Sequence, residues 1–164
     1  MTKIAISNLA WRKSEDVRVF DIMSDLNVLN LEISPFRDTS TLPEAKKQFH
    51  NETASFLNKY GIRVVAFQAL MFRYPEISIF ESEVARNKIS ERLKGVLEFL
   101  NQIGATVAVF GSPKNKIRGA LSRNEAMNIA KKFFGQIADQ AKIFNVIFCI
   151  EPTPSAYGAD FICN

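Results

Sequence analysis

Five short apolar runs alternate with longer segments in which apolar residues recur at helical spacing. Strict alternation of strands and helices is typical of an α/β protein with a parallel sheet and right-handed crossovers. The sequence therefore predicts four successive β-α units, followed by a fifth strand and a loop. The predicted strands begin near residues 3, 28, 62, 105 and 146. Because no linker or low-complexity tract interrupts them, residues 1–164 are expected to form a single domain.

Capping boxes and glycines mark the ends of the helices that connect these strands. Residues 41–44 and 122–125 each place a Ser or Thr three residues before a Glu, which is the capping-box pattern. Gly61 and Gly104 follow the last apolar positions of two helices, where glycine is favoured. Ser14 is predicted to cap the first helix. The buried face of that helix is expected to carry Val17, Phe20, Met23 and Leu26. The four predicted helices cover residues 14–26, 41–60, 82–103 and 122–141.

The last apolar run, from Val146 to Ile150, is predicted to be a fully buried strand. Glu151 follows it directly, and Pro152 and Pro154 then prevent any continuation of the strand or of a helix. Buried parallel strands carry chemistry at their C-terminal ends, so Glu151 is the first candidate for a functional residue. The alternative is a structural carboxylate that caps a turn or pairs with a nearby lysine.

Polar residues also stand at the ends of the other predicted strands. The set consists of Asn8, Glu32, Gln68, Ser112 and Glu151. Residues 28–34 alternate between apolar and polar, so one face packs on helices and the other turns polar groups inward. A solvent-exposed sheet face would show the same alternation. We expect Asn30, Glu32, Gln68, Cys149 and Glu151 to point into the interior of a barrel, and Leu29, Leu31, Phe67, Phe148 and Ile150 to face helices.

Two architectures fit this order of elements. A doubly wound sheet of five strands would be complete at 164 residues, whereas a (β/α)8 barrel needs about 250 residues and would be present only as its first half. The polar strand ends, the fifth strand without a following helix and the missing glycine-rich phosphate fingerprint favour the barrel. The fold class is therefore α/β of TIM-barrel type, truncated to five strands and four helices. Half a barrel exposes two strand edges, which a second copy of the chain is expected to cover.

Composition excludes several classes of protein. The formal charge of +4 is mild and is not gathered in a dense block of Lys and Arg, which argues against nucleic acid binding. Cys149 and Cys163 form neither a CxxC pair nor a disulfide framework. No apolar segment reaches the length of a membrane span, and the N-terminus lacks the apolar core of a signal peptide. The chain is thus expected to be a cytoplasmic, enzyme-like domain without a membrane partner.

Three segments resemble the xylose isomerase-like TIM barrels, a group that includes sugar phosphate isomerases and epimerases. They are residues 111–116 (GSPKNK), 150–154 (IEPTP) and 157–161 (YGADF). The resemblance implies that Glu151, as the Glu that ends the fifth strand, binds a catalytic divalent metal ion (Mn²⁺, Mg²⁺ or Zn²⁺). The family's other ligands come from strands six to eight, which this chain lacks. By itself the chain is therefore expected to be inactive, and a metal site is expected only in a longer protein.

The implied reaction moves a proton next to the carbonyl of a sugar or sugar phosphate, by way of an ene-diolate. A divalent metal stabilises that charge, and carboxylates such as Glu151 move the proton. The residues expected to bind the substrate are Asn8, Glu32, Gln68, Ser112, Lys114 and Lys116. The two lysines would hold a phosphate, although loop lysines more commonly only promote solubility.

Two other functions remain open at this stage. An endonuclease IV-like DNA-repair enzyme shares the fold, but that branch binds its zinc cluster through histidines at the ends of strands three and four. Those positions hold Gln68 and Gly111-Ser112, and His50, the only histidine, is expected on a helix surface. The second alternative is a non-catalytic fragment that binds sugar or associates with itself.

Overall fold

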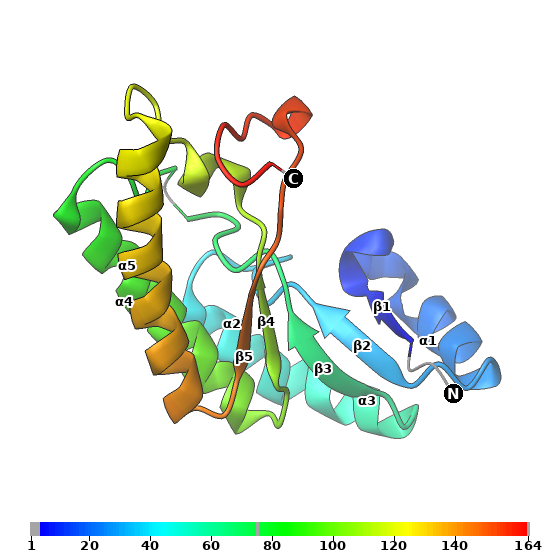
Figure 1. Ribbon diagram of the computed structural model, residues 1–164. Helices are drawn as coiled ribbons and strands as arrows, with labels where there is room; N and C mark the ends of the chain where they lie inside the picture. Colours follow the sequence, from blue (N-terminus) through cyan, green and yellow to red (C-terminus); the bar gives the residue numbers. More distant parts are fainter. Residues whose placement is uncertain (1–3, 75, 164) are drawn as a thin grey trace.

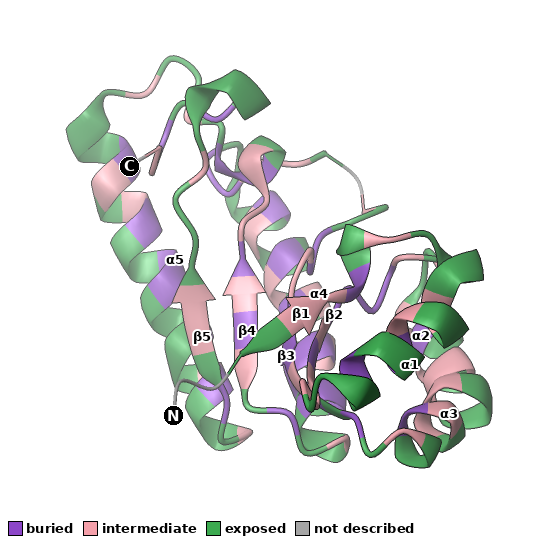
Figure 2. Cartoon of the chain, turned by 90° about the vertical axis from the view of Figure 1, so that its right-hand side faces the viewer, coloured by how far each residue is buried: buried purple, intermediate pink, exposed green. Residues whose placement is uncertain are grey.

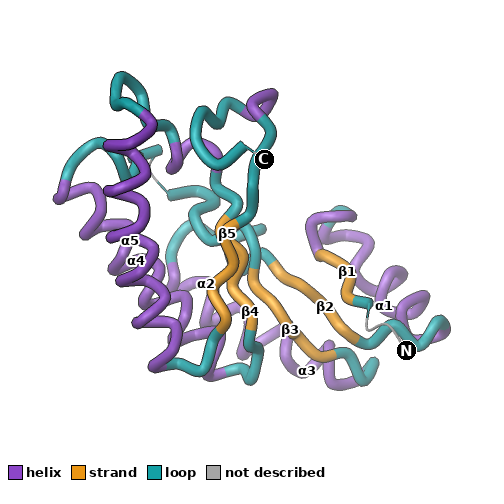
Figure 3. Tube along the Cα trace, in the orientation of Figure 1, coloured by secondary structure: helices purple, strands orange, loops and turns teal. Residues whose placement is uncertain are grey.

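Five parallel strands form one sheet in the computed structural model of the protein, which describes residues 4–74 and 76–163. The strands are β1 (Ala5–Ser7), β2 (Asn30–Ile33), β3 (Arg63–Phe67), β4 (Val107–Phe110) and β5 (Ile147–Ile150). They lie side by side in the order β1-β2-β3-β4-β5, as a twisted fan (Figure 3). The predicted order is confirmed, and a doubly wound sheet of order 2-1-3-4-5 is excluded. Lys3, the predicted start of the first strand, lies outside the described residues.

Helices connect successive strands, as the alternation of the sequence predicts (Figure 1). The helical elements are α1 (Asp16–Asp25), α2 (Leu42–Gln48), a π-helical segment (Phe49–Thr53), α3 (Ala54–Lys59), α4 (Glu83–Gln102) and α5 (Arg123–Ile143). The predicted helix over residues 41–60 is thus a single helical run that contains a π turn. Both capping boxes are present at the starts of α2 and α5. None of the described helices is long and apolar enough to cross a membrane.

The first helix differs from its prediction. Ser14 does not cap it, because a 3₁₀ turn over Lys13–Glu15 comes first and α1 begins only at Asp16. Phe20 and Met23 are buried as expected. Val17 and Leu26, however, are 53% and 68% exposed. Helix α1 therefore buries only the face that carries Phe20 and Met23. Val17 and Leu26 are not covered by any of residues 4–74 and 76–163.

Aromatic side chains join the sheet to the helices on one face. The ring of Phe67 on β3 lies 5.3 Å from that of Phe99 on α4, and the ring of Phe110 on β4 lies 5.6 Å from that of Phe134 on α5. Leu31 on β2 belongs to the same buried cluster. The prediction that Leu31 and Phe67 face helices is therefore confirmed.

Strand β5 is not the fully buried strand that its sequence predicts. Ile147 and Ile150 are 63% and 38% exposed, and Figure 2 shows β5 as half-buried and exposed throughout. Phe148 does pack towards α5, with its ring 6.4 Å from that of Phe134. The reason is topology: β5 pairs only with β4, so its other edge has no neighbouring strand among the described residues.

Candidate functional site

The carboxyl ends of the strands bring polar side chains from distant parts of the chain together. The amide of Gln68, which follows β3, donates a hydrogen bond to the hydroxyl of Ser7 at the end of β1. Glu32 on β2 lies near enough to Glu151, after β5, for the two charges to interact. These contacts pass across the intervening strands, so the side chains share the face of the sheet that the helices leave free.

Glu151 occupies a defined position at the end of β5. Its backbone N–H donates to the carbonyl oxygen of Phe110 at 3.1 Å, which continues the pairing of β4 with β5 by one residue. Its side chain crosses directly over Gly111, where a Cβ atom would lie only 2.2 Å from the carboxylate oxygen Oε2. A larger residue at position 111 would therefore require the end of the Glu151 side chain to move.

Burial and charge act together on Glu32. Burial is the larger cause of a raised pKa at this carboxyl, and the negative charge of Glu151 raises it further. A carboxyl whose pKa is raised by burial and by a second carboxylate is a candidate for binding a cation or for handling a proton.

The two loop lysines occupy very different positions. Lys114 is largely exposed, and its ammonium pairs with Glu76. Lys116 is fully buried, and its ammonium donates to the backbone oxygen of Glu151 at 2.7 Å and to Oγ1 of Thr153 at 3.1 Å. Lys116 is therefore not a surface lysine that only promotes solubility. Ser112 is half-buried beside Gly111.

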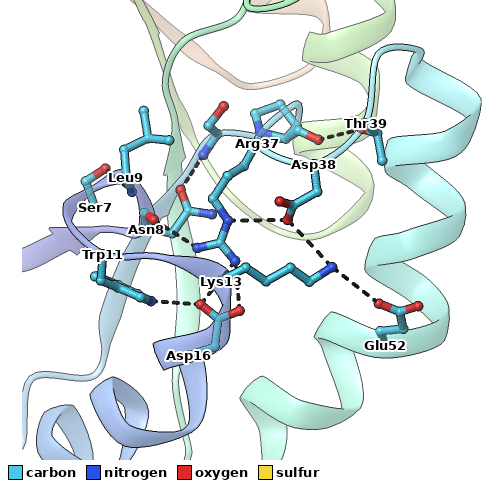
Figure 4. A network of polar contacts seen from close by, with 12 residues as sticks. Ser7, Asn8, Leu9, Trp11, Lys13, Asp16, Arg37, Asp38, Thr39 and Glu52 are labelled. Atoms are coloured by element: carbon cyan, nitrogen blue, oxygen red, sulfur yellow. Dashed lines mark hydrogen bonds and ion pairs between the residues drawn. The ribbon is translucent and has the colours of Figure 1, made fainter.

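Asn8 is buried at the end of β1, where its side chain holds two strand ends together. Its Oδ1 accepts a hydrogen bond from the backbone N–H of Ser34 at 2.8 Å. Arg37 donates to the backbone oxygen of Asn8 and binds both carboxylate oxygens of Asp16, at 3.0 and 2.7 Å (Figure 4). The indole of Trp11 donates to the same carboxylate at 2.7 Å. No local motif signals this cluster, because Arg37 and Asp16 stand 21 positions apart.

A cavity of about 240 Å³ lies on the other side of the sheet, between α1 and the π-helical segment. Its walls include Phe20, Leu31 and Phe99, which belong to the helix-facing core. Lys13 lies at this cavity between Asp38 and Glu52, at 3.6 and 3.9 Å (Figure 4). Because Leu31 faces the helices while its neighbour Glu32 faces the opposite way, this cavity is separate from the carboxylate pair.

The carboxylate pair consists of oxygen donors of the kind that a divalent metal ion takes. Oxygen donors such as Glu32 and Glu151 suit Mg²⁺ or Mn²⁺, which take several such ligands. Residues 4–74 and 76–163 contain no group of three or more His, Cys, Asp or Glu side chains placed to hold a metal ion. Glu32 and Glu151 could therefore supply two ligands to a metal ion, and the remaining ligands would have to come from other residues.

The raised pKa of Glu32 predicts a pH-dependent effect on stability. The folded state holds the proton of Glu32 more tightly than the unfolded state, so ionising this carboxyl destabilises the fold. This loss of unfolding free energy is absent below pH 4.5. It grows as the pH rises through the raised pKa of Glu32, and it is complete above that pKa. Glu32→Gln is therefore expected to raise the melting temperature at pH 7 and to change it little at pH 4, without metal.

Glu44→Gln is the matched control, with the opposite sign. Hydrogen bonds from Thr41 lower the pKa of Glu44, so its contribution is present above pH 4.5 and is lost as the pH falls through the lowered pKa. This variant should melt at a lower temperature than the unmodified chain at pH 7. A Glu32→Gln variant that is less stable at pH 7, or that differs equally at both pH values, would contradict the assignment. Scanning calorimetry in the presence of a chelator makes both measurements.

Comparison with known proteins agrees with the fold. No family model and no curated protein matches the sequence. Among solved structures, a 3-keto-D-glucoside 4-epimerase, YcjR, from E. coli has a TM-score of 0.69 at 14% identity, over 94% of this chain and 57% of that one. The D-psicose 3-epimerase of Clostridium cellulolyticum H10, solved with D-tagatose, has a TM-score of 0.64 at 14% identity, over 94% and 53%. The IOLI protein with a binding zinc atom has a TM-score of 0.65 at 16% identity, over 91% and 51%.

The chain therefore spans about half the length of the solved structures that it matches. Identities of this size show the fold alone. The α/β fold of TIM-barrel type predicted from the sequence is confirmed, as a part of such a barrel with five parallel strands.

Proposed function

We propose that this chain forms part of the active site of a metal-dependent sugar or sugar phosphate isomerase or epimerase. The observation that carries the proposal is the placement of Glu151 over Gly111 at the end of β5, within interaction distance of Glu32. Support also comes from the fold, because solved structures of similar fold include a D-psicose 3-epimerase and an L-ribulose 3-epimerase. Functional residues of TIM barrels stand at this end of the strands.

In this proposal each strand end has a role. Glu151 is a metal ligand and takes part in proton transfer. Glu32, Gln68 and Ser112 bind hydroxyl groups of the sugar. Asn8 would contribute from the end of β1, where it also lines the cavity beside α1. Lys114, whose ammonium is exposed, exchanges Glu76 for a phosphate group when the substrate carries one. The ammonium of Lys116 binds the segment after β5, so a role in holding the phosphate would require it to exchange these hydrogen bonds.

The residues and the metal would divide the chemistry between them. A bound divalent cation supplies positive charge that stabilises the oxyanion formed when a ketose loses the proton next to its carbonyl. Glu32, whose pKa is raised by burial and by the charge of Glu151, is suited to hold or return a proton. Gln68, held by Ser7, presents its amide at a fixed position for a hydroxyl group.

Proton exchange with solvent tests this function. A longer form of the protein that carries the remaining strands is expected to place deuterium on the carbon next to the carbonyl of a ketose, in D₂O with Mn²⁺. The 164-residue chain alone is expected to give no exchange above buffer, because Glu32 and Glu151 are too few ligands for the metal. The absence of exchange by the longer form, across ketoses and ketose phosphates with NMR detection, would refute the proposal.

The alternative is a chain that associates with itself and has no turnover, and the exposed edge of β5 supports it. Ile147 is 63% exposed on a strand that has one free edge among the described residues. Exposed apolar edge strands pair readily with other chains.

Self-association of the 164-residue chain is therefore expected in sedimentation velocity, with a sedimentation coefficient that rises with concentration. Ile147→Lys should suppress it, because an edge lysine disfavours strand pairing. Val84→Lys on α4 is the matched control, since Val84 is also 63% exposed but lies far from the sheet edge in sequence and on a helix. A single monomeric species at all concentrations, or equal effects of the two lysines, would exclude this edge as the interface.

A further inference from the structure

Lys116 is a fully buried cation beside the proposed functional carboxylate. It ends a 3₁₀ turn (Pro113–Lys116) that follows β4, and its relative exposure is 0%. A buried ammonium is costly unless hydrogen bonds and nearby negative charge compensate it. Its two acceptors are the backbone oxygen of Glu151 and Oγ1 of Thr153, both on the segment that follows β5. The cation thus joins the loop after β4 to the end of β5.

Further contacts tie the same two loops together. The hydroxyl of Thr153 donates to the backbone oxygen of Gly111 at 2.7 Å, and the carboxylate of Asp160 accepts from the backbone N–H of Arg118 at 2.6 Å. Figure 1 shows the C-terminal loop, in red, beside the loop that leaves β4. Gly111 and Lys116 therefore hold Glu151 from two sides: Gly111 leaves room for its side chain, and Lys116 binds its backbone.

The local charges agree with this geometry. Burial lowers the pKa of Lys116, and the negative charge of Glu151 opposes that effect. Lys114, two residues earlier on the same turn, is exposed and pairs with Glu76 instead. The two lysines of one turn thus offer a direct comparison between a buried and an exposed ammonium.

We propose that Lys116 is a positioning residue for Glu151, and that its buried ammonium fixes the end of β5 so that the carboxylate is presented to a divalent cation. The inference rests on the proposed function for the role of Glu151, but the positioning itself can be measured without it. Mutation of a residue that orients a metal ligand typically lowers metal affinity by about 10–100-fold.

The first test measures local order by hydrogen exchange. Lys116→Met keeps the length of the side chain and removes the ammonium. It is expected to speed amide exchange over residues 151–160 by about tenfold, because a hydrogen bond to a charged group is lost at each acceptor. Exchange within α4 and α5 should stay within about twofold, and Lys114→Met should change neither region. Unchanged exchange over residues 151–160, or a uniform rise across the whole chain, would overturn the positioning role.

The second test adds Mn²⁺ alone to a longer form of the protein that carries the remaining strands, and detects binding by paramagnetic broadening of backbone NMR signals. Electrostatics alone predicts that removing a positive charge near Glu32 and Glu151 strengthens Mn²⁺ binding. Positioning predicts the opposite, and Lys116→Met is expected to weaken Mn²⁺ binding by about 10–100-fold. Equal or tighter binding by this variant would overturn the proposal.

The two tests separate the inference from the function on which it rests. If a longer form of the protein that carries the remaining strands shows no broadening around Glu32, Gly111 and Glu151, the metal role of Glu151 fails, and the exchange data alone decide the positioning role. If Lys116→Met does not fold, Thr153→Val replaces it, because this change removes one acceptor of the ammonium and the link to Gly111. The valine variant should show the same local rise in exchange, and a flat profile would overturn the proposal.

Discussion

Replacing Glu151 with glutamine is expected to abolish proton exchange into a ketose by any longer form of the protein that carries it out. The amide retains the shape of the side chain and one acceptor oxygen, but it loses the negative charge that a divalent cation requires. The fold should be retained, because the side chain of Glu151 is exposed and its backbone hydrogen bonds to Phe110 and Lys116 do not involve the carboxylate.

The stabilisation by metal provides a second measurement on the same variant. A ligand that binds only the folded state raises the melting temperature according to its concentration relative to its dissociation constant. The increment caused by Mn²⁺ should shrink or vanish in Glu151→Gln and persist in Glu81→Gln, whose exposed carboxylate lies just before α4. Full activity in the Glu151 variant, with the same Mn²⁺ increment as the unmodified protein, would mean that Glu151 is structural.

Phe99→Ala is expected to give the largest loss of stability. Phe99 is 1% exposed, and its ring lies 5.3 Å from that of Phe67 and 5.6 Å from that of Phe49. It therefore joins α4 to β3 and to the π-helical segment. Truncation of a buried phenylalanine leaves a cavity and costs about 3–5 kcal/mol of unfolding free energy. For a chain of this size, that corresponds to a fall in melting temperature of about 6–20 °C.

Phe72→Ala serves as the control for this prediction, because the Phe72 side chain is 48% exposed. It should change the free energy of unfolding by less than about 0.5–1 kcal/mol, the usual range for surface positions. Chemical denaturation monitored by circular dichroism measures both variants. If Phe99→Ala cost no more than Phe72→Ala, the contact between α4 and β3 would not be central to the core.

The strand order could be predicted from the sequence because it depends on regular spacing. Each apolar run is followed by one helix-length segment, and right-handed crossovers then place successive strands side by side. The capping boxes at Thr41 and Ser122 were equally readable, because a cap is formed within four residues. The proximity of Glu32 to Glu151 could be predicted for a related reason, because the carboxyl ends of the strands of a parallel sheet meet at one edge.

Features that depend on distant neighbours could not be predicted in this way. The burial of Lys116 requires the end of β5, 35 positions further along, to lie beside its turn. The exposure of Ile147 depends on the absence of a further strand beside β5 among the described residues, which no local pattern records. The π turn at Phe49–Thr53 leaves the apolar spacing of the helical run nearly unchanged, so periodicity does not detect it.

The sequential order of the strands also bears on how the chain folds during its synthesis. Every strand after the first pairs with the strand made immediately before it, so the sheet can grow in the order in which the ribosome delivers its parts. Each new strand pairs across a single crossover connection with a strand that already exists, and no pairing has to wait for a later part of the sequence. The newest strand is always the unprotected edge while this happens, and in this chain that strand is β5, the one that presents Glu151.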